Sequence, residues 1–273
     1  MTDNQTISSD NQVKAGLLEK AELSPEYIYS QALALAKAAQ KHNLPIRLIG
    51  ATAFINHCPH HNYLYKQFNR VLTDVDMITY SKTPKDKLDA MFKELGYEPI
   101  PHLGWHSINR DIYVNPEQLY IDVFKDELAF CHKISLIGRL ELDFPTIPLA
   151  DMMLAKLQVV KINLKDLLDI VVLLLEHDFG EAGEVDKIEL GRFISLLSND
   201  WGFYYTSTTN LDKVKTLVDG LEALDAAQKK VVHDKVNFLL KQIEQAPKSL
   251  RWKARAAIGT RMRWYEEVES VER

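Results

Sequence analysis

A change of pattern near residue 145 constrains the fold of this chain more than any other feature of the sequence. Before it, helical segments alternate with short runs typical of strands, at 46–49, 75–80, 106–114 and 118–124. After it, apolar residues recur at helical spacing, at 149–161, 165–177, 188–197, 211–217, 224–243 and 250–268. We therefore expect an α+β fold: a mixed sheet with flanking helices over 23–145, followed by an all-helical region over 146–273.

Local signals mark where several of these segments begin and end. Ser24 followed by Pro25 predicts an N-cap and the first position of a helix. Gly50 opens a turn between a short strand and a helix, and Gly96 closes the helix that precedes it. Residues 1–22 are polar, and we expect a disordered tail there.

Composition narrows the class of protein. Of the 273 residues, 46% are hydrophobic and 26% are charged, which is ordinary for a soluble globular chain, and the net charge of −5 argues against polyanion binding by overall charge. Two cysteines, Cys58 and Cys131, are too few for a disulfide framework and fit a reducing compartment. A single disulfide between them is the alternative. The start is not a signal peptide, and the longest apolar run, 170–175, is too short for a bilayer. We expect a cytoplasmic protein with no membrane partner.

Three aspartates lie inside apolar, strand-like segments. Asp74 and Asp76 flank Val75, so as alternate residues of a strand they face the same side. Carboxylates this close repel and favour a cation between them, and oxygen ligands suit Mg²⁺ or Mn²⁺ rather than zinc. Asp122 is the charged residue of an otherwise apolar and aromatic run. If the two strands are neighbours, the pattern predicts a two-metal site; a solvated turn is the alternative for an isolated Asp-x-Asp.

Several stretches of the sequence resemble the nucleotidyltransferase superfamily. They are Gly50-Ala51-Thr52, Leu72-Thr73-Asp74-Val75-Asp76-Met77, Ile121-Asp122-Val123, and the segment that begins at Thr146-Ile147-Pro148 and continues through Lys156 and Lys165. More narrowly, the chain is similar to uncharacterised bacterial nucleotidyltransferase-like proteins that are distant relatives of abortive-infection toxins. The resemblance covers roughly residues 30–178 and implies a nucleotidyltransferase-like sheet.

The resemblance also implies roles for the matched residues. The Gly50-Ala51-Thr52 turn would begin a helix whose free N–H groups cradle nucleotide phosphates. Asp74, Asp76 and Asp122 would hold metal, and Asp122 would also help to activate an acceptor hydroxyl. The sequence departs from the family in two places: Ala51 stands where a second Gly or Ser is usual, and the gap from Gly50 to Asp74 is long.

Four cations are candidates for the phosphates. The resemblance places Lys156, together with Lys165, against the triphosphate as charge stabilisers; the alternative is that Lys156 snorkels out of its apolar helix. Arg70 would bind phosphate or orient Asp76, or it is a surface residue. For Arg110 we favour a cross-strand ion pair over contact with the nucleotide.

Three further groups have both a functional and a structural interpretation. The cluster of His57, Cys58, His60 and His61 is less typical of zinc than of a loop near the site. For the aromatic run at 201–206 we favour packing between helices over stacking on a base. The basic stretch at 248–263, with Trp252 and Trp264, is either an RNA-binding surface or a solvated helix face.

These predictions describe a metal-dependent transferase. It would use Mg²⁺ or Mn²⁺ to move a nucleoside monophosphate from an NTP, such as ATP, to a hydroxyl of a protein, an RNA or a small molecule. Two alternatives stay open. One is an inactive nucleotide-binding or partner-binding module of the same fold, and the other is a toxin-like component of a defence system.

Overall fold

A five-stranded mixed sheet forms the first half of the protein. The computed structural model describes residues 23–68, 70–101 and 110–267. The sheet has the order β1-β2-β5-β4-β3, and only the β2–β5 pair is parallel. The expected strands are therefore found, apart from 106–109, which lie outside the described residues. The strands are β1 (Arg47–Ile49), β2 (Val75–Thr79), β3 (Glu98–Pro99), β4 (Arg110–Val114) and β5 (Tyr120–Lys125).

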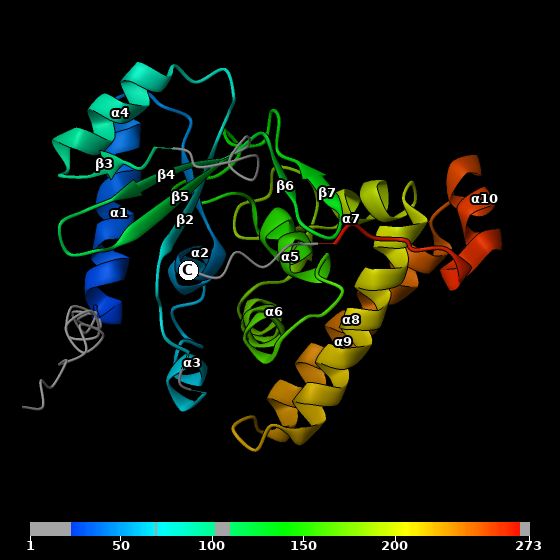
Figure 1. The fold of residues 1–273 in the computed structure, drawn as a ribbon. Coiled ribbons are helices and arrows are strands. Elements are labelled where there is room, and N and C mark those ends of the chain that lie inside the picture. The colour runs from blue at the N-terminus through cyan, green and yellow to red at the C-terminus, as the bar shows by residue number, and fades with distance from the viewer. Residues whose placement is uncertain (1–22, 69, 102–109, 268–273) are drawn as a thin grey trace, which may run out of the picture.

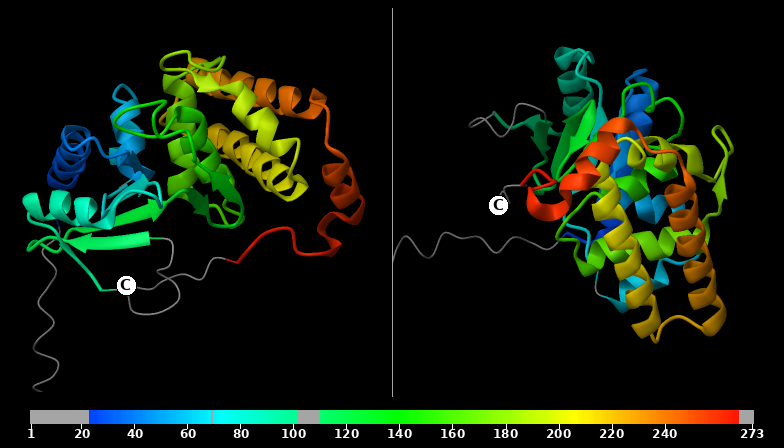
Figure 2. Two further views of the ribbon diagram at one scale, coloured as in Figure 1. Left: turned by 90° about the horizontal axis from the view of Figure 1, so that it is seen from above. Right: turned by 90° about the vertical axis from the view of Figure 1, so that its right-hand side faces the viewer.

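Helices cover one face of this sheet (Figures 1 and 2). The inward residues of β2 and β5, such as Val75 and Ile121, are fully buried, because alternate residues of a strand share a face. Gly96 ends its helix with φ +82°, and the Ser24 hydroxyl accepts the N–H of Tyr27 at 3.1 Å, as the sequence predicted. The helices of this half are α1 (Pro25–Lys41), α2 (Gly50–His57), α3 (Tyr63–Gln67) and α4 (Lys85–Glu94).

Beyond the five-stranded sheet the chain is mainly helical, with two short strand pairings that the sequence pattern did not indicate. A β6–β7 hairpin follows β5 directly, and β8 pairs with β9 in parallel. None of the described helices combines the length and apolar character needed to cross a membrane. The elements are β6 (Glu127–Ala129), β7 (Lys133–Ser135), α5 (Leu149–Leu157), α6 (Leu164–Glu176), β8 (Phe179–Gly180), β9 (Ile188–Glu189), α7 (Leu190–Leu197), α8 (Trp201–Gly220), α9 (Ala226–Gln245), α10 (Leu250–Ile258) and a 3₁₀ turn (Gly259–Arg261).

Helix α6 lies at the centre of the molecule and joins the two halves. Residues 168–174 of α6 are all buried, because α2, α5, α8 and α9 pack around it (Figure 1). One cluster of buried apolar side chains extends from Ile28 in α1 to Ile243 in α9. The predicted boundary near residue 145 between two domains stays a prediction.

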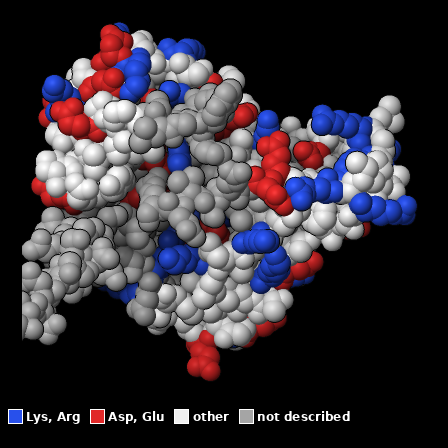
Figure 3. All heavy atoms as spheres, viewed as in Figure 1, with Lys and Arg blue, Asp and Glu red and all other residues white. Residues whose placement is uncertain are grey.

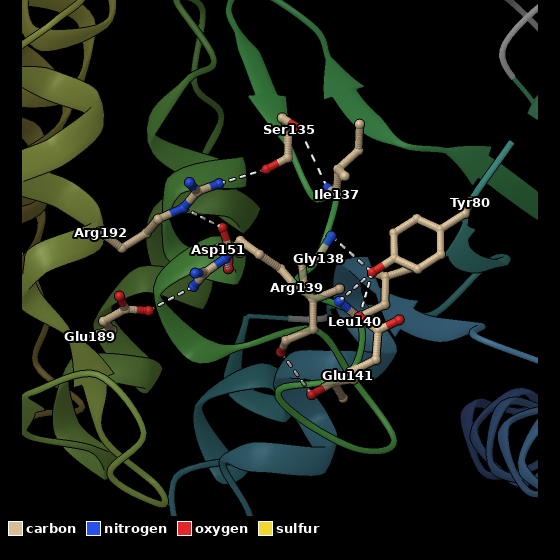
Figure 4. A network of polar contacts seen from close by, with 12 residues as sticks. Tyr80, Ser135, Ile137, Gly138, Arg139, Leu140, Glu141, Asp151, Glu189 and Arg192 are labelled. Carbon is tan, nitrogen blue, oxygen red and sulfur yellow. Dashed lines mark hydrogen bonds and ion pairs between the residues drawn. The ribbon is translucent and has the colours of Figure 1, made fainter. Parts of the chain in front are cut away.

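A buried polar network fixes α5 (Figure 4). Asp151 in α5 has no exposed side-chain surface, and it binds Arg139 at 2.6 Å and Arg192 of α7 at 2.9 Å. Arg139 also reaches Glu189 at 2.7 Å. Burial raises the pKa of Asp151, and the two arginines oppose that shift. The network orients α5, which carries Lys156.

Two histidines, His132 buried and His57 nearly so, are expected to make stability depend on pH. His57 Nε2 lies 2.6 Å from the Thr146 hydroxyl, and His132 Nε2 lies 2.9 Å from that of Thr206. Burial lowers the pKa of each imidazole to about 4. The unfolded chain therefore binds protons that the folded chain does not, so the contribution of each histidine is complete above about pH 6.5 and is lost as pH falls towards 4.

We expect the free energy of unfolding to fall by about 2 kcal/mol per histidine between about pH 7.5 and about pH 5. Urea titrations at the two pH values measure this. The variant His57→Gln/His132→Gln should show a shallower dependence, because glutamine does not titrate. An unchanged slope in that variant would show that other groups cause the dependence.

Candidate active site

The pairing of β2 with β5 brings two of the predicted carboxylates together. Asp76 and Asp122 are register partners in the parallel pair, and their neighbours Val75 and Val123 are fully buried on the opposite face. The two strands are therefore neighbours, as the three-acid prediction required. Asp74 lies one residue before β2, is partly exposed, and accepts a hydrogen bond from the Thr73 hydroxyl at 3.2 Å.

The first turn of α2 lies against Asp76. Ile49 is the register partner of Asp76, and Gly50 follows with φ +63°. A Cβ atom at Gly50 would stand 2.6 Å from Asp76 Oδ2, so only glycine fits without displacing the carboxylate. The residue before α2, Ile49, makes no side-chain cap hydrogen bond, and the first N–H groups of a helix attract anions. Thr52 is buried and donates its hydroxyl to the Ile49 carbonyl at 3.3 Å.

A cavity of about 650 Å³ opens over these residues. Gly50, Asp76 and Asp122 line it from the sheet side, and Lys156 and Asp166 line it from α5 and α6. Its remaining wall is largely apolar. Those residues include Phe124, Leu128, Phe130, Met152, Val159, Val160 and Tyr265.

Arg110 forms the cross-strand ion pair that we favoured from the sequence. Its Nη1 lies 3.6 Å from Asp122 Oδ2, and β4 pairs with β5 at this point. Arg110 also lines the cavity. Its guanidinium therefore contributes positive charge beside the Asp76–Asp122 pair.

Lys156 points at carboxylates and faces the cavity rather than snorkelling outward. Its Nζ lies 2.7 Å from Asp166 Oδ1 and 3.0 Å from Asp169 Oδ2. Burial alone would lower the pKa of Lys156, but Asp169 and Asp166 outweigh burial and raise it. Lys156 is therefore a fixed cation in the cavity wall.

Arg70 and Lys165 do not line the cavity. The Arg70 guanidinium binds Asp169 through Nε at 2.9 Å and Nη2 at 2.6 Å, so it orients Asp169 and not Asp76. The reason is that α3, in the long insert, packs on α6 and carries Arg70 there. Lys165 is exposed on the first turn of α6. Ala51, Thr52 and Asp74 also lie outside the cavity lining.

The histidine cluster makes polar contacts within the protein. His60 Nδ1 and His61 Nδ1 lie 2.5 and 2.6 Å from the two oxygens of Glu176, and Cys58 is a buried free thiol. Within residues 23–68, 70–101 and 110–267, no three His, Cys, Asp or Glu side chains gather as a group that could hold a metal.

The aromatic run at 201–206 packs between helices, as we favoured. Trp201 and Phe203 of α8 are buried, and Tyr204 meets Trp252 of α10 edge to face at 5.2 Å between ring centroids. The basic stretch lies on and after α10, where Lys and Arg side chains gather at the right of Figure 3. Two of its cations have structural contacts, because Lys248 and Arg255 donate to backbone carbonyls.

Some residues of the site had no local signal in the sequence. Asp169 pairs with Arg70 and Lys156, which come from other parts of the chain. Phe130 and Tyr265 were not singled out, since nothing near them in the chain indicates that they share a cavity wall.

The donor chemistry of the cavity fits a divalent cation that arrives with phosphate. Mg²⁺ is usually held by one or two carboxylates, with phosphate and water oxygens completing its octahedron. Asp76 and Asp122 supply two carboxylates side by side in the register of adjacent strands. An all-protein set of three ligands is not needed for such an ion.

Among known proteins, this chain is similar to solved structures at low sequence identity. No family model matches the chain, and no curated protein matches it. One similar solved structure is the antibiotic-resistance factor ANT(2'')-Ia, at 12% identity over 52% of this chain and 80% of that chain, with a TM-score of 0.35. Another is an antigenic nucleotidyltransferase-like protein from Paracoccidioides brasiliensis, at 16% identity over 77% of this chain and 95% of that chain, with a TM-score of 0.40. These likenesses concern the fold alone.

We expect Gly50→Ala to destabilise the protein by more than Gly96→Ala. Both glycines have positive φ, so each substitution costs about 1 kcal/mol in backbone strain. Only at Gly50 does the new methyl group collide with a carboxylate, while nothing lies within 4 Å at Gly96. Urea unfolding of both variants checks this, and equal losses would mean that the contact with Asp76 is easily relieved.

We also expect Asp169→Asn to lower the free energy of unfolding by about 3 kcal/mol. The substitution removes the negative charge that pairs with Arg70 and Lys156, whose side chains are largely shielded from water. Asp212→Asn is the matched control, since Asp212 is 65% exposed and pairs only with Lys215 across one helical turn. A loss at Asp169 no larger than at Asp212 would contradict a stabilising role for the buried pair.

Proposed function

We propose that this protein transfers a nucleoside monophosphate from an NTP to an acceptor hydroxyl. The main support is the position of Asp76 and Asp122, which lie side by side on neighbouring parallel strands and line a cavity. Gly50, at the start of α2, lies against Asp76. Acids beside an open helix N-terminus suit a phosphate ligand that brings its own cation.

Asp76 and Asp122 would hold Mg²⁺, or Mn²⁺, together with the triphosphate. When bound, the ion neutralises negative charge on the phosphate oxygens and so lowers the barrier to displacement at phosphorus. Asp74, which the sequence predicted as a third metal ligand, lies one residue before β2 and does not line the cavity.

Protein cations and dipoles complete the phosphate environment. The N–H groups at the start of α2 bind phosphate oxygens, and the helix dipole favours their charge. Lys156, fixed by Asp166 and Asp169, and Arg110, beside Asp122, supply positive charge that needs no reorganisation during reaction. The apolar wall excludes water, which would otherwise compete with the acceptor.

The chemical step is a displacement at the α-phosphorus. The acceptor oxygen forms a bond to phosphorus while the bond to the bridging oxygen of pyrophosphate breaks. Asp122 accepts the proton of the acceptor hydroxyl, because its carboxylate faces the cavity at the acid pair. Pyrophosphate leaves with the bridging oxygen. The acceptor is a hydroxyl of a protein, an RNA or a small molecule.

A second candidate function is nucleotide binding without turnover. It is favoured by the position of Asp74 outside the cavity lining, which leaves two of the three predicted acids in the wall, and by Ala51 in the first turn of α2. We propose a cytoplasmic location for either function, which the two buried free cysteines support, since free thiols persist in reducing compartments.

We expect calorimetry to detect binding of MgATP to the wild type and a loss of at least about tenfold in affinity for Asp76→Asn/Asp122→Asn. The control is Asp86→Asn/Asp212→Asn, which removes two exposed carboxylates elsewhere with the same change in net charge. Binding by the site variant that equals the control would refute the proposed site. Binding without pyrophosphate release, across a panel of hydroxyl acceptors, would select the second candidate.

A further inference from the structure

The last residues that the structure describes return from the helical half to the cavity. After α10 and its 3₁₀ turn, residues 262–267 run back towards the sheet, as the red trace in Figures 1 and 2 shows. We call residues 262–267 the C-terminal segment. Two of its side chains, Tyr265 and Glu267, line the same cavity as Asp76 and Asp122.

Hydrogen bonds hold the C-terminal segment in place at several points. Arg255 Nη2 donates to the carbonyls of Met262 at 2.8 Å and Arg263 at 3.2 Å. Trp264 Nε1 donates to the Thr206 hydroxyl at 3.0 Å, and the N–H of Glu266 donates to the Cys131 carbonyl at 3.0 Å. The segment is therefore fixed to α10, α8 and the β6–β7 hairpin.

The segment contributes an aromatic ring to the apolar part of the wall. Phe130 comes from the β6–β7 turn, Val159 and Val160 follow α5, and Tyr265 is brought by the C-terminal segment. Charged side chains line the cavity from the strands (Asp76, Arg110, Asp122), from α5, α6 and the loop between them (Lys156, Asp166, Lys161), and from the C-terminal segment itself (Glu267). A ligand in the cavity therefore meets charged groups as well as an aromatic and aliphatic surface, to which the segment adds the ring of Tyr265.

We propose that the C-terminal segment forms the nucleobase subsite of this cavity, with the ring of Tyr265 as its stacking surface. The inference rests on the proposed function, which places the triphosphate at the acids. A planar heteroaromatic base gains from stacking on an aromatic side chain and from contact with apolar walls. Trp264 and Arg255 are positioning residues, because they hold the segment and lie outside the cavity lining.

One glycine offers a way to displace the segment without touching the cavity. A Cβ atom at Gly202 in α8 would overlap the backbone carbonyl oxygen of Trp264, so the segment passes where only glycine leaves room. Gly202 does not line the cavity. Gly220, in the last turn of the same helix, has open space around it and is the matched control.

The test compares two ligands of the full chain by calorimetry, MgATP and Mg-tripolyphosphate. Both carry the triphosphate, but only ATP carries a base. We expect the wild type and Gly220→Ala to prefer ATP, and Gly202→Ala to lose about tenfold of that preference, the size of one stacking contact. Binding of tripolyphosphate should change little.

Substitutions at Tyr265 test the ring directly and do not depend on Gly202→Ala folding normally. Tyr265→Ala should lose the preference for ATP, and Tyr265→Phe should keep it, because phenylalanine retains the stacking face. An unchanged preference in Tyr265→Ala would overturn the inference, as would a wild type that binds both ligands equally.

The outcomes separate this inference from the proposed function. If the wild type binds both ligands with equal affinity and needs Asp76 and Asp122 to do so, the phosphate site stands and the base subsite is wrong. If the wild type binds neither ligand, the proposed function is wrong, and the subsite falls with it.

Discussion

The parallel pairing of β2 with β5 is the constraint on which the rest of the site depends. Its register sets Asp76 beside Asp122, although like charges at that spacing repel. The buried faces of the two strands fix the register, because a slip of one residue would turn Val75 or Ile121 out of the core and a carboxylate into it. Burial of apolar side chains thus holds the two acids together. Gly50 then fits against Asp76 only in this arrangement.

A second constraint is the balance of buried charge behind the cavity. Arg70 and Lys156 share Asp169, and Lys156 also binds Asp166, so two cations face two anions. A buried charge is tolerated when it is paired and hydrogen-bonded. The four side chains join the insert after α2, the helix α5 and the helix α6. The insert therefore has a structural role, since it supplies Arg70 to a helix 99 positions further along the chain.

The sequence alone predicted the features of the fold that depend on local pattern. The N-cap at Ser24, the glycines at 50 and 96, and the strands that carry Asp76 and Asp122 follow from propensity and alternation. The sequence did not predict that Arg70 pairs with Asp169. Arg70 is close to Asp74 in sequence, which suggested that it orients Asp76, but the packing of α3 on α6 places it against Asp169 instead. The β6–β7 strands of three residues each are too short to show a period. Tyr265 lies in the cavity wall because its neighbours Trp264 and Glu266 form hydrogen bonds with Thr206 and Cys131, which are far away in the sequence.

The cavity takes its pair of acids from the sheet and much of its shape from the helical half. Asp76, Asp122 and Arg110 lie on strands, whereas α5, α6 and the C-terminal segment close the space above them. The Asp151 network and the Arg255 hydrogen bonds hold those closing elements at positions set by the helices, not by the strands. A change in helix packing would therefore alter ligand contacts by moving the helical wall of the cavity. The two acids would keep their positions, because the register of the sheet fixes them. Affinity for the variable part of a ligand can accordingly change without alteration of the phosphate-binding residues.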